Sequence, residues 1–364
     1  MNLLFCGDIM PGGVLPYQDN YISSELLDYL NSFDFRIGTL EAAIGTNMPF
    51  DSVKEKGRQN IIYARDEDFF RVKEMGLDVV SLANNHVCDL GKDGLKNTIS
   101  ILEKNGVKHC GAGMNVEEAS IPAIIEKDGL KVAVLAYCMS EMKYMGYVEL
   151  AGKDNYGVNA LDIDKAETDI KEAKRKCDVV VVLPHWGREY QYEPLVECVS
   201  MARKMIKAGA DAVFGTHTHQ IQPFVEYKGK PICFSMGNFL FPDFYMYPPR
   251  PIWYPESVEK YKGVKEIVGY PFPINEPIKQ VWNPVSRYGC VLELNIDSQS
   301  VNYKTQHVCL SEDNVLSLFN MDLPFDHELR KASRVFTDPI VYVKRKHRKL
   351  VGDLYHRLKK YKQE

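Results

Sequence analysis

Short β-rich runs alternate with helical patterns along the first 240 residues, and this alternation constrains the fold more than any other feature. Runs that predict strands cover residues 2–8, 35–41, 77–85, 131–138, 178–187 and 210–217. Between them, apolar side chains recur at spacings of three and four residues, as in amphipathic helices, over residues 67–76, 94–106, 164–177 and 195–209. The alternation predicts an α/β fold, with a largely parallel sheet and helices on its faces.

The composition is that of a globular protein without a charged polymer as an obvious partner. The chain has 364 residues, 45% of them hydrophobic, which is enough for one large domain or two. A net charge of −4 with 26% charged residues does not favour nucleic acid binding. The nine cysteines include no CxxC pair, so we expect reduced core residues such as Cys6 and Cys233 rather than a cysteine zinc site.

Nothing in the sequence predicts a membrane span. The first residues have neither a basic start nor a long apolar run, which argues against a signal peptide. No apolar run approaches the roughly 18 residues that a transmembrane helix needs. We therefore expect a cytoplasmic protein, at most peripheral to a membrane.

The pattern changes after residue 224. Residues 225–239 contain the turn YKGK between two strand-like runs, which predicts an antiparallel hairpin, and residues 288–297 and 302–310 predict another. Between these hairpins, residues 242–286 are rich in Pro, Tyr, Phe and Trp and show little periodicity. We interpret this insertion as a lid or wall over a site; the alternative is a surface insertion without a chemical role.

The predicted organisation is one domain over residues 1–310 and a C-terminal extension over residues 311–364. The end of the extension, residues 343–364, is strongly basic. Apolar residues recur there at helical spacing, at Leu350, Leu354, Leu358 and Tyr361, which predicts a short amphipathic basic helix. Such a helix suits an anionic membrane surface or an acidic partner, but a solvated tail that caps the domain is the favoured interpretation.

Polar side chains follow the predicted strands where each strand ends. They are Asp8, Glu41, the run Asn84, Asn85 and His86, then His185, and finally His217 and His219. One such residue alone is more often a cap, but the C-terminal ends of strands in an open α/β sheet converge on one crevice, where ligands bind. Imidazole nitrogens with carboxylate and amide oxygens suit Mn²⁺, Fe²⁺ or Zn²⁺. At strand spacing, His217 and His219 would point the same way and reach neighbouring metals.

Several motifs together resemble a known family. GDIM, TLE, ANNHxxDxG, GAG, HWGREY, the block GADAVFGTHTHQIQPFVEYKGKPICFSMGNFLF and the later RYG resemble the bacterial capsule synthesis proteins, the CapA or poly-γ-glutamate synthesis type (PGA_cap). That family resembles in turn the calcineurin-like metallophosphoesterases. The resemblance covers residues 1 to about 300. It implies a four-layer α/β/β/α sandwich, with two mixed sheets packed between helices.

The resemblance also implies a metal site. Asp8 matches the first metal-binding aspartate, Glu41 the bridging aspartate, Asn85 the amide ligand, His185 the single strand-end histidine, and His217 and His219 the paired histidines. Two positions depart from the phosphoesterase pattern: Met10 stands where a metal-binding histidine is expected, and Glu41 replaces an aspartate. We therefore expect one firm ion site, from Glu41, Asn85, His185 and His217, and one weaker site, from Asp8, Glu41 and His219.

Other residues are predicted to act on the substrate. By the resemblance, His86 protonates the leaving group while hydroxide attacks phosphorus. Asp89 either orients His86 or caps the helix that starts near Gly91. Arg188 would neutralise a phosphate or carboxylate. The remaining expected substrate contacts are Asn84, Trp186, Glu189, Tyr190 and Asn238, although the WGREY turn equally suits packing and a surface ion pair.

The sequence thus leaves three functional hypotheses open. The first is a metal-dependent hydrolase that cleaves a phosphoester in capsule or cell-surface polymer biosynthesis, with an anionic small molecule or polymer as substrate. The second is an accessory protein in poly-γ-glutamate or capsule polysaccharide assembly, which binds polymer or capsule synthesis enzymes. The third is hydrolysis of a γ-glutamyl amide by the same activated water.

Overall fold

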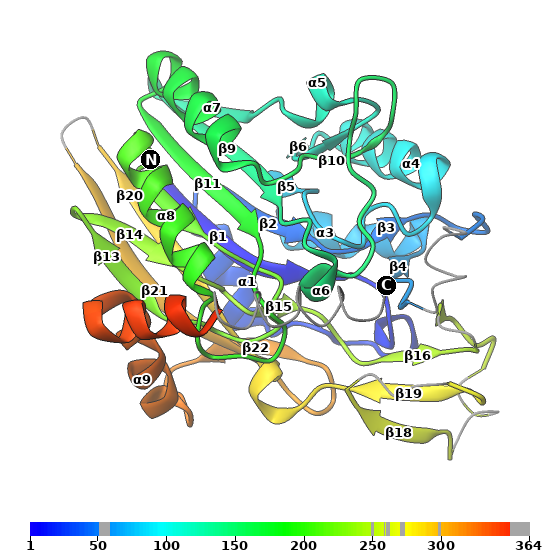
Figure 1. The fold of residues 1–364 in the computed structure, drawn as a ribbon. Helices are drawn as coiled ribbons and strands as arrows, with labels where there is room; N and C mark the ends of the chain where they lie inside the picture. The colour runs from blue at the N-terminus through cyan, green and yellow to red at the C-terminus, as the bar shows by residue number, and fades with distance from the viewer. Residues whose placement is uncertain are drawn as a thin grey trace, which may run out of the picture.

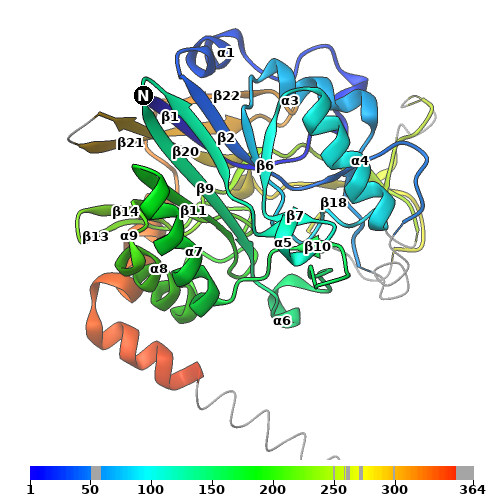
Figure 2. The same cartoon turned by 90° about the horizontal axis from the view of Figure 1, so that it is seen from above.

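Two mixed β-sheets pack face to face, and helices cover their outer faces (Figures 1 and 2). The computed structural model describes residues 1–50, 59–248, 251–257, 259, 263–269, 274–297 and 300–349. Seen from above in Figure 2, α1, α3 and α4 lie outside one sheet, and α7 and α8 lie outside the other. This is the four-layer α/β/β/α sandwich that the family resemblance implied.

The first sheet has the strand order β22-β21-β20-β1-β2-β5-β6, and β15 also pairs with β1. Its strands are β1 (Asn2–Ile9), β2 (Phe35–Leu40), β5 (Val79–Ser81), β6 (Lys108–Cys110), β15 (Asn238–Leu240), β20 (Tyr288–Ile296), β21 (Val301–Leu310) and β22 (Leu316–Phe319). β1, β2, β5 and β6 run parallel, whereas β20, β21 and β22 form an antiparallel meander beside β1. The predicted late hairpin is therefore confirmed as β20 and β21.

The second sheet has the order β13-β14-β12-β11-β9-β8. Its strands are β8 (Ala123–Lys127), β9 (Leu130–Cys138), β11 (Val179–His185), β12 (Ala212–Phe214), β13 (Phe224–Tyr227) and β14 (Lys230–Cys233). β11 is buried along its whole length between parallel neighbours, which explains its uninterrupted apolar sequence. The YKGK turn joins β13 and β14, so the first hairpin is confirmed as well.

The described helices include some that lie in the predicted periodic segments and others that the sequence did not predict. They are α1 (Ser24–Asn31), α3 (Phe70–Glu74), α4 (Gly91–Lys104), α5 (Val116–Ala119), α6 (Met142–Met145), α7 (Ile163–Lys176), α8 (Val196–Ala208) and α9 (Asp326–Thr337), with 3₁₀ turns η1 (Leu15–Tyr17), η2 (Asp66–Phe69) and η4 (Pro284–Arg287). α4, α7 and α8 match their predictions closely. The pattern at residues 67–76 divides into η2 and the short α3, so only its second half is α-helical.

β1 and β15 approach each other unusually closely. A Cβ on Gly7 would lie 1.9 Å from the carbonyl oxygen of Gly237, so only glycine fits there. The amide of Asp8 donates to that same oxygen at 3.0 Å, and Asp8 is in register with Asn238. The close approach therefore places Asn238 directly beside Asp8.

The Pro- and aromatic-rich insertion forms a small sheet of its own. Its order is β17-β16-β19-β18, from β16 (Phe244–Met246), β17 (Ile252–Trp253), β18 (Lys265–Val268) and β19 (Ile278–Val281), at the lower right of Figure 1. One apolar cluster joins this sheet to the body of the protein. We call it the aromatic cluster; its buried members are Met10, Ala42, Ile62, Phe241, Phe244, Met246, Ile252, Ile274, Ile278 and Trp282.

Two short strand pairs complete the structure: β3 (Ala43–Ile44) with β4 (Tyr63–Ala64), and β7 (Ala112–Gly113) with β10 (Gly157–Val158). Eight of the nine cysteines are buried, as expected of core residues. Within the described ranges, no helix has both the length and the apolar character needed to cross a membrane.

The C-terminal extension packs on the body of the protein. β22 pairs with β21, and α9 contacts α8 and β13. Residues 339–349 are helical, and two of their basic side chains form ion pairs with the segment before and within α8, Arg345 with Glu193 and Lys349 with Glu197. The apolar positions Leu350, Leu354, Leu358 and Tyr361 of the predicted basic helix lie outside the described residues.

Candidate metal centre

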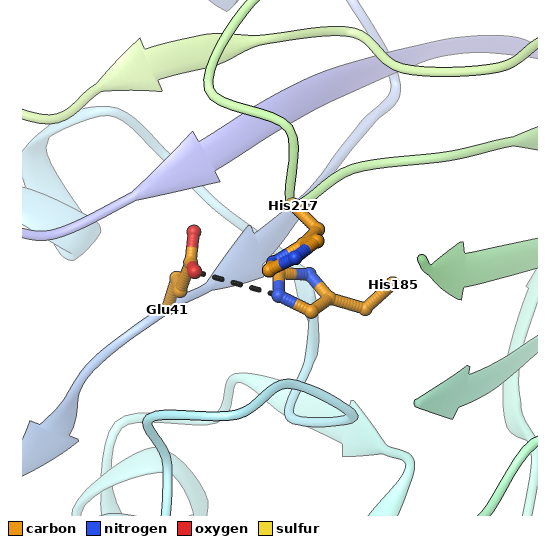
Figure 3. A group of neighbouring side chains, drawn as sticks. All are labelled: Glu41, His185 and His217. Atoms are coloured by element: carbon orange, nitrogen blue, oxygen red, sulfur yellow. Dashed lines mark ion pairs between the residues drawn. The ribbon is translucent and has the colours of Figure 1, made fainter. Parts of the chain in front are cut away.

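Five strand-end side chains from both sheets meet at one buried point. We call them the polar cluster: Asp8, Glu41, His185, His217 and His219. Asp8 belongs to β1 and Glu41 follows β2, whereas His185 ends β11 and the other two histidines follow β12. Each of the five is at most 1% exposed. Figure 3 shows three of them, with the imidazole of His185 next to the carboxylate of Glu41 and the ring of His217 beside it.

The ligand atoms of the polar cluster form two groups that share Glu41. In one group, atoms of Glu41, His185 and His217 lie within 4.8 Å of one another, and in the other, atoms of Asp8, Glu41 and His219 do so. Oε1 of Glu41 lies 3.4 Å from Nε2 of His185 and 3.9 Å from Nε2 of His219. The structure thus holds two buried His/Asp/Glu groups that could bind metal, with one bridging carboxylate between them.

Neighbouring polar groups orient the histidines. Oδ1 of Asn85 lies 2.8 Å from Nε2 of His185, so an amide oxygen joins the first group. The other ring nitrogen of His185 contacts the hydroxyl of Thr216 at 2.9 Å. Nδ1 of His219 contacts Oδ1 of Asn238 at 3.0 Å, and Asn238 in turn donates to the carbonyl of Ser286. Such partners fix the ring orientation of metal-binding histidines.

Several buried polar atoms of the polar cluster lack hydrogen-bond partners, and their chemistry indicates whether the cluster fits a metal ion. Five of its buried atoms have no hydrogen-bond partner in the described structure: Oδ1 of Asp8, both carboxylate oxygens of Glu41, and both ring nitrogens of His217. Buried polar atoms are otherwise nearly always paired. The unsatisfied carboxylate oxygens, and the one ring nitrogen of His217 that carries no proton, are acceptors of the kind that bind Mn²⁺, Fe²⁺ or Zn²⁺, and they converge. The residues present therefore fit a divalent cation.

The pKa shifts of the polar cluster indicate that a bound positive charge would stabilise its carboxylates. Burial raises the pKa of Asp8 to about 7, and burial together with the charge of Asp8 raises the pKa of Glu41 well above its usual range. Burial lowers the pKa of His217 to about 3 and that of His219 to about 4, and it lowers the pKa of His185 well below its usual value. Without a cation the site thus favours neutral groups, whereas a bound cation favours carboxylates and neutral imidazoles.

The two paired histidines reach different metal groups, but not for the reason expected from the sequence. β12 ends at Phe214, so His217 and His219 lie in a loop and not at strand spacing. Their φ angles are 96° and 54°, in the left-handed region that residues with side chains rarely adopt. This strained loop turns the two rings so that their centroids are 6.3 Å apart. Backbone strain of this kind concentrates at functional sites.

His86 and Asp89 form a buried pair at the edge of the polar cluster. Nδ1 of His86 lies 2.7 Å from Oδ2 of Asp89, and the same oxygen accepts the amide of Ile62 at 2.7 Å. The residue that caps α4 is Leu90, without a side-chain bond, so the helix-cap alternative for Asp89 is not what the structure contains. Asp89 orients His86 instead. His86 is 7% exposed, more than any member of the polar cluster.

The expected substrate contacts fall in different environments. Trp186 is fully buried and its indole donates to the carbonyl of Phe234 at 2.8 Å, so it packs in the core and offers no surface to a ligand. Asn84 accepts from the amides of His86 and Val87 and shapes the loop that carries them.

The segment after His185 is less buried than the polar cluster. Arg188 is exposed, and Glu189 and Tyr190 are half-buried. Burial raises the pKa of Glu189 to about 7, and the charge of Glu189 contributes to the raised pKa of Glu41, so the two carboxyl groups are electrostatic neighbours. The ring of Tyr190 lies 6.1 Å from that of His219.

The sequence did not single out the residues that back the cluster on its far side. The ring of Trp282 lies 4.8 Å from that of His219, and the ring of Phe241 lies 5.3 Å from it. Met10 occupies the position of an expected metal-binding histidine, but it packs in the aromatic cluster with Phe241 and Trp282. The aromatic composition of residues 242–286 was the available signal. That composition predicted a wall over a site, but it did not indicate which aromatic ring would contact a candidate metal-binding side chain.

Comparisons with known proteins agree on one family. A family model described as bacterial capsule synthesis protein PGA_cap matches residues 2–243. The capsule biosynthesis protein CapA of Bacillus anthracis is 32% identical over 251 residues, which cover 66% of this chain and 60% of that protein. The PGA biosynthesis protein CapA of Bacillus subtilis is 30% identical, over 65% of this chain and 62% of that protein. The matched region thus spans less than two thirds of either relative.

A structural comparison adds a more distant neighbour. The NAD nucleotidase of Haemophilus influenzae superposes with a TM-score of 0.43 at 12% identity, over 91% of this chain and 55% of that one. The fold assignment given above rests on the strand order of this chain itself.

Proposed function

The chain belongs to the bacterial capsule synthesis protein family PGA_cap, and from that premise we propose that it is a metal-dependent hydrolase which cleaves a phosphoester in capsule or cell-surface polymer biosynthesis. The observation that carries the proposal is the set of five unsatisfied buried atoms around Glu41, divided between two ligand groups. Burying the carboxylate of Glu41 and the imidazole of His217 without hydrogen-bond partners is costly in a core that serves folding alone.

Glu41 would hold both ions. With Asn85, His185 and His217 it offers four protein ligands to one of them, and with Asp8 and His219 three ligands to the other. The second set lacks a fourth protein ligand because Met10 points into the aromatic cluster. We therefore expect tighter binding in the first set. The nitrogen and oxygen donors suit Mn²⁺, Fe²⁺ or Zn²⁺, and when bound such ions supply a nucleophilic hydroxide at neutral pH and polarise phosphoryl oxygens.

The protein contributes the acid. Because Asp89 accepts the Nδ1 proton of His86, the Nε2 atom is the one that exchanges a proton with the leaving oxygen. The carboxylate of Asp89 also stabilises the charged imidazolium. Arg188 is exposed on the segment that follows His185 and would attract an anionic substrate.

The proposal is tested with the purified protein loaded with Mn²⁺. We expect release of p-nitrophenol from bis(p-nitrophenyl) phosphate or p-nitrophenyl phosphate. His185→Ala should lower the rate about 100-fold or more and lower the bound Mn²⁺, because it removes a ligand and not merely a supporting group. The matched control is His327→Ala, since His327 is an exposed histidine of α9 with a side chain 77% accessible. A metal-loaded protein that is inert on a broad phosphoester panel would refute the proposal.

The second candidate is an accessory role in capsule or poly-γ-glutamate assembly, the biosynthetic process that the names of the two CapA relatives print. In that case the metal centre would be structural, and the protein would bind an anionic polymer or capsule synthesis enzymes. Retention on a poly-γ-glutamate column by a protein inert toward phosphoesters would support this candidate. Release of free glutamate from poly-γ-glutamate would instead support amide hydrolysis.

A further inference from the structure

One face of β19 packs into the aromatic cluster, and a glutamine interrupts it. Ile278 of this face and Trp282, the residue that follows β19, are buried members of the cluster, and Gln280 lies between them in the sequence. In register, Gln280 pairs with Phe244 of β16 on one side and with Ile267 of β18 on the other, and both of these also pack in the cluster. Because side chains alternate along a strand, Gln280 shares their face. It is 1% exposed.

The amide of Gln280 is unsatisfied. Neither its oxygen nor its nitrogen has a hydrogen-bond partner in the described structure. A buried amide without partners destabilises the folded state, whereas leucine or methionine would fill the same place in an apolar cluster without that penalty. A glutamine at this position is therefore unfavourable for folding alone, and a donor and an acceptor remain available to a ligand.

Gln280 lies close to the metal centre along the strand. Trp282, two residues further on, is roughly 7 Å away by strand geometry. Its ring lies 4.8 Å from the ring of His219, which is one of the candidate ligands. The backbone amide of Trp282 donates to Asp243 and its indole donates to the carbonyl of Pro242, so the ring is held in place. Trp282 thus separates the polar cluster from the unsatisfied amide.

We propose that Gln280 and Trp282 form a subsite for a nucleobase, so that the phosphoester substrate is a nucleotide derivative; this inference rests on the proposed hydrolase function. The glutamine amide presents N–H and C=O side by side in one plane, which matches a heterocycle that carries N–H next to a carbonyl. The ring of Trp282, two residues along the chain, would stack on the same heterocycle. Entry of the base requires rotamer changes of the covering rings, which are common on binding.

The test compares two substrates with the same leaving group in the Mn²⁺-loaded protein. They are the p-nitrophenyl ester of thymidine 5′-monophosphate, whose base carries the required edge, and bis(p-nitrophenyl) phosphate, which has no such edge. Gln280→Leu should lower kcat/KM for the thymidine ester about tenfold or more and leave bis(p-nitrophenyl) phosphate within about twofold. The melting temperature should not fall, because an unsatisfied amide is removed. The 3-methylthymidine ester cannot donate a hydrogen bond from N3, so kcat/KM for this ester should be the same in Gln280→Leu as in the unmodified protein.

Ile278→Leu, an apolar change on the same strand face, is the packing control and should affect both substrates equally. An equal loss on both substrates in Gln280→Leu, or no loss on either, would overturn the subsite. If the unmodified protein is inert on both esters, the hydrolase proposal fails separately. Calorimetric titration with thymidine monophosphate then decides the subsite, since binding that Gln280→Leu weakens supports it and absence of binding overturns it.

Discussion

His86 is the residue whose chemistry the structure defines best. Asp89 accepts its Nδ1 proton at 2.7 Å inside the protein, in a position where the same carboxylate also binds the amide of Ile62. The amide of Ile62 therefore holds the carboxylate, and the carboxylate orients the imidazole. As the proposed general acid, His86 would contribute most to the cleavage of substrates that have a poor leaving group.

We expect His86→Asn to act selectively on substrates with poor leaving groups. For an alkyl phosphoester, kcat/KM should fall by roughly 10²–10⁴, since protonation of the leaving oxygen is lost. For a p-nitrophenyl ester the decrease should be under about tenfold, because p-nitrophenolate departs readily as an anion. Asp89→Asn should show the same selectivity with a smaller loss. Steady-state rates on the two substrates measure this, and an equal decrease on both would assign His86 a structural role.

We expect Glu41 to destabilise the metal-free protein and to be required for metal binding. Its pKa is raised by burial and by the nearby charge of Asp8, so without a cation the two carboxyl groups are unfavourable together. Glu41→Gln should therefore raise the melting temperature in EDTA and abolish tight binding of Mn²⁺, because both ligand groups share this residue. Thermal melts with and without metal, combined with metal analysis, test both halves. A stabilised variant that still binds two ions would contradict the assignment.

At the level of elements, the contact between β1 and β15 sets the position of Asp8. Gly7→Ala should destabilise the protein by about 1–3 kcal/mol, because its Cβ would collide with the carbonyl of Gly237 and separate the strands. Affinity for Mn²⁺ should fall as well, since Asp8 and Asn238 are in register at this contact. Denaturant unfolding and metal titration measure the two effects.

Gly152→Ala is the matched control for that prediction. The nearest atom to a Cβ at Gly152 is 3.5 Å away, so the change in stability should stay within roughly 0.5 kcal/mol. If Gly7→Ala were equally mild, the close approach of the strands would not constrain the site.

One buried carboxylate, that of Asp243, connects the two ends of the insertion. Asp243 accepts from Arg287 with both oxygens, at 2.9 and 3.0 Å, and from the backbone of Trp282. A buried ion pair of this kind fixes the relative position of two segments more than it stabilises the folded protein. Here it connects the start of the insertion to its end, and so places Trp282 against His219. The expectation of a wall over a site stays an interpretation, but one ring of the insertion does contact the candidate metal centre.

For the whole molecule, the C-terminal extension contributes to the same core as the rest of the chain. Leu316, Phe325, Val335 and Phe336 are buried members of the main hydrophobic core. We expect a chain that ends after residue 310 to lose cooperative unfolding or to aggregate, because β21 loses its partner strand and this apolar surface opens.

A chain that ends after residue 349 should instead melt within about 2 °C of the full chain, because it keeps β22, α9 and both ion pairs to the α8 region. Scanning calorimetry of the two truncated proteins tests the pair of expectations. A stable, monomeric protein ending at residue 310 would support the predicted domain boundary. Vesicle binding by the full chain and by the chain ending at 349 would separately test a role of the basic end at membranes.

Local patterns predicted β1, β2, β5, β9, β11, β12, the two hairpins and the three longest described helices, and the limits of that prediction have clear physical causes. α4, α7 and α8 and the two hairpins follow from periodicity and turn residues, because burial of one face is a local property of the sequence. The paired histidines were placed on a strand, whereas β12 ends three residues before His217. Positive φ angles at His217 and His219 leave no local signal, since glycine or asparagine would normally mark them.

The sequence by itself determined which chemical groups are available, because polar residues at the ends of apolar strands can be read one strand at a time. Only the tertiary structure shows that these groups converge into two candidate ligand groups. Glu41 lies in both candidate ligand groups because the two sheets meet at their strand ends. Trp186, which was expected to contact substrate, packs in the core, whereas Trp282, for which the sequence suggested no role, lies against His219. Packing between distant segments, such as β19 with the loop after β12, depends on shape and solvation across the whole molecule, and no local pattern encodes it.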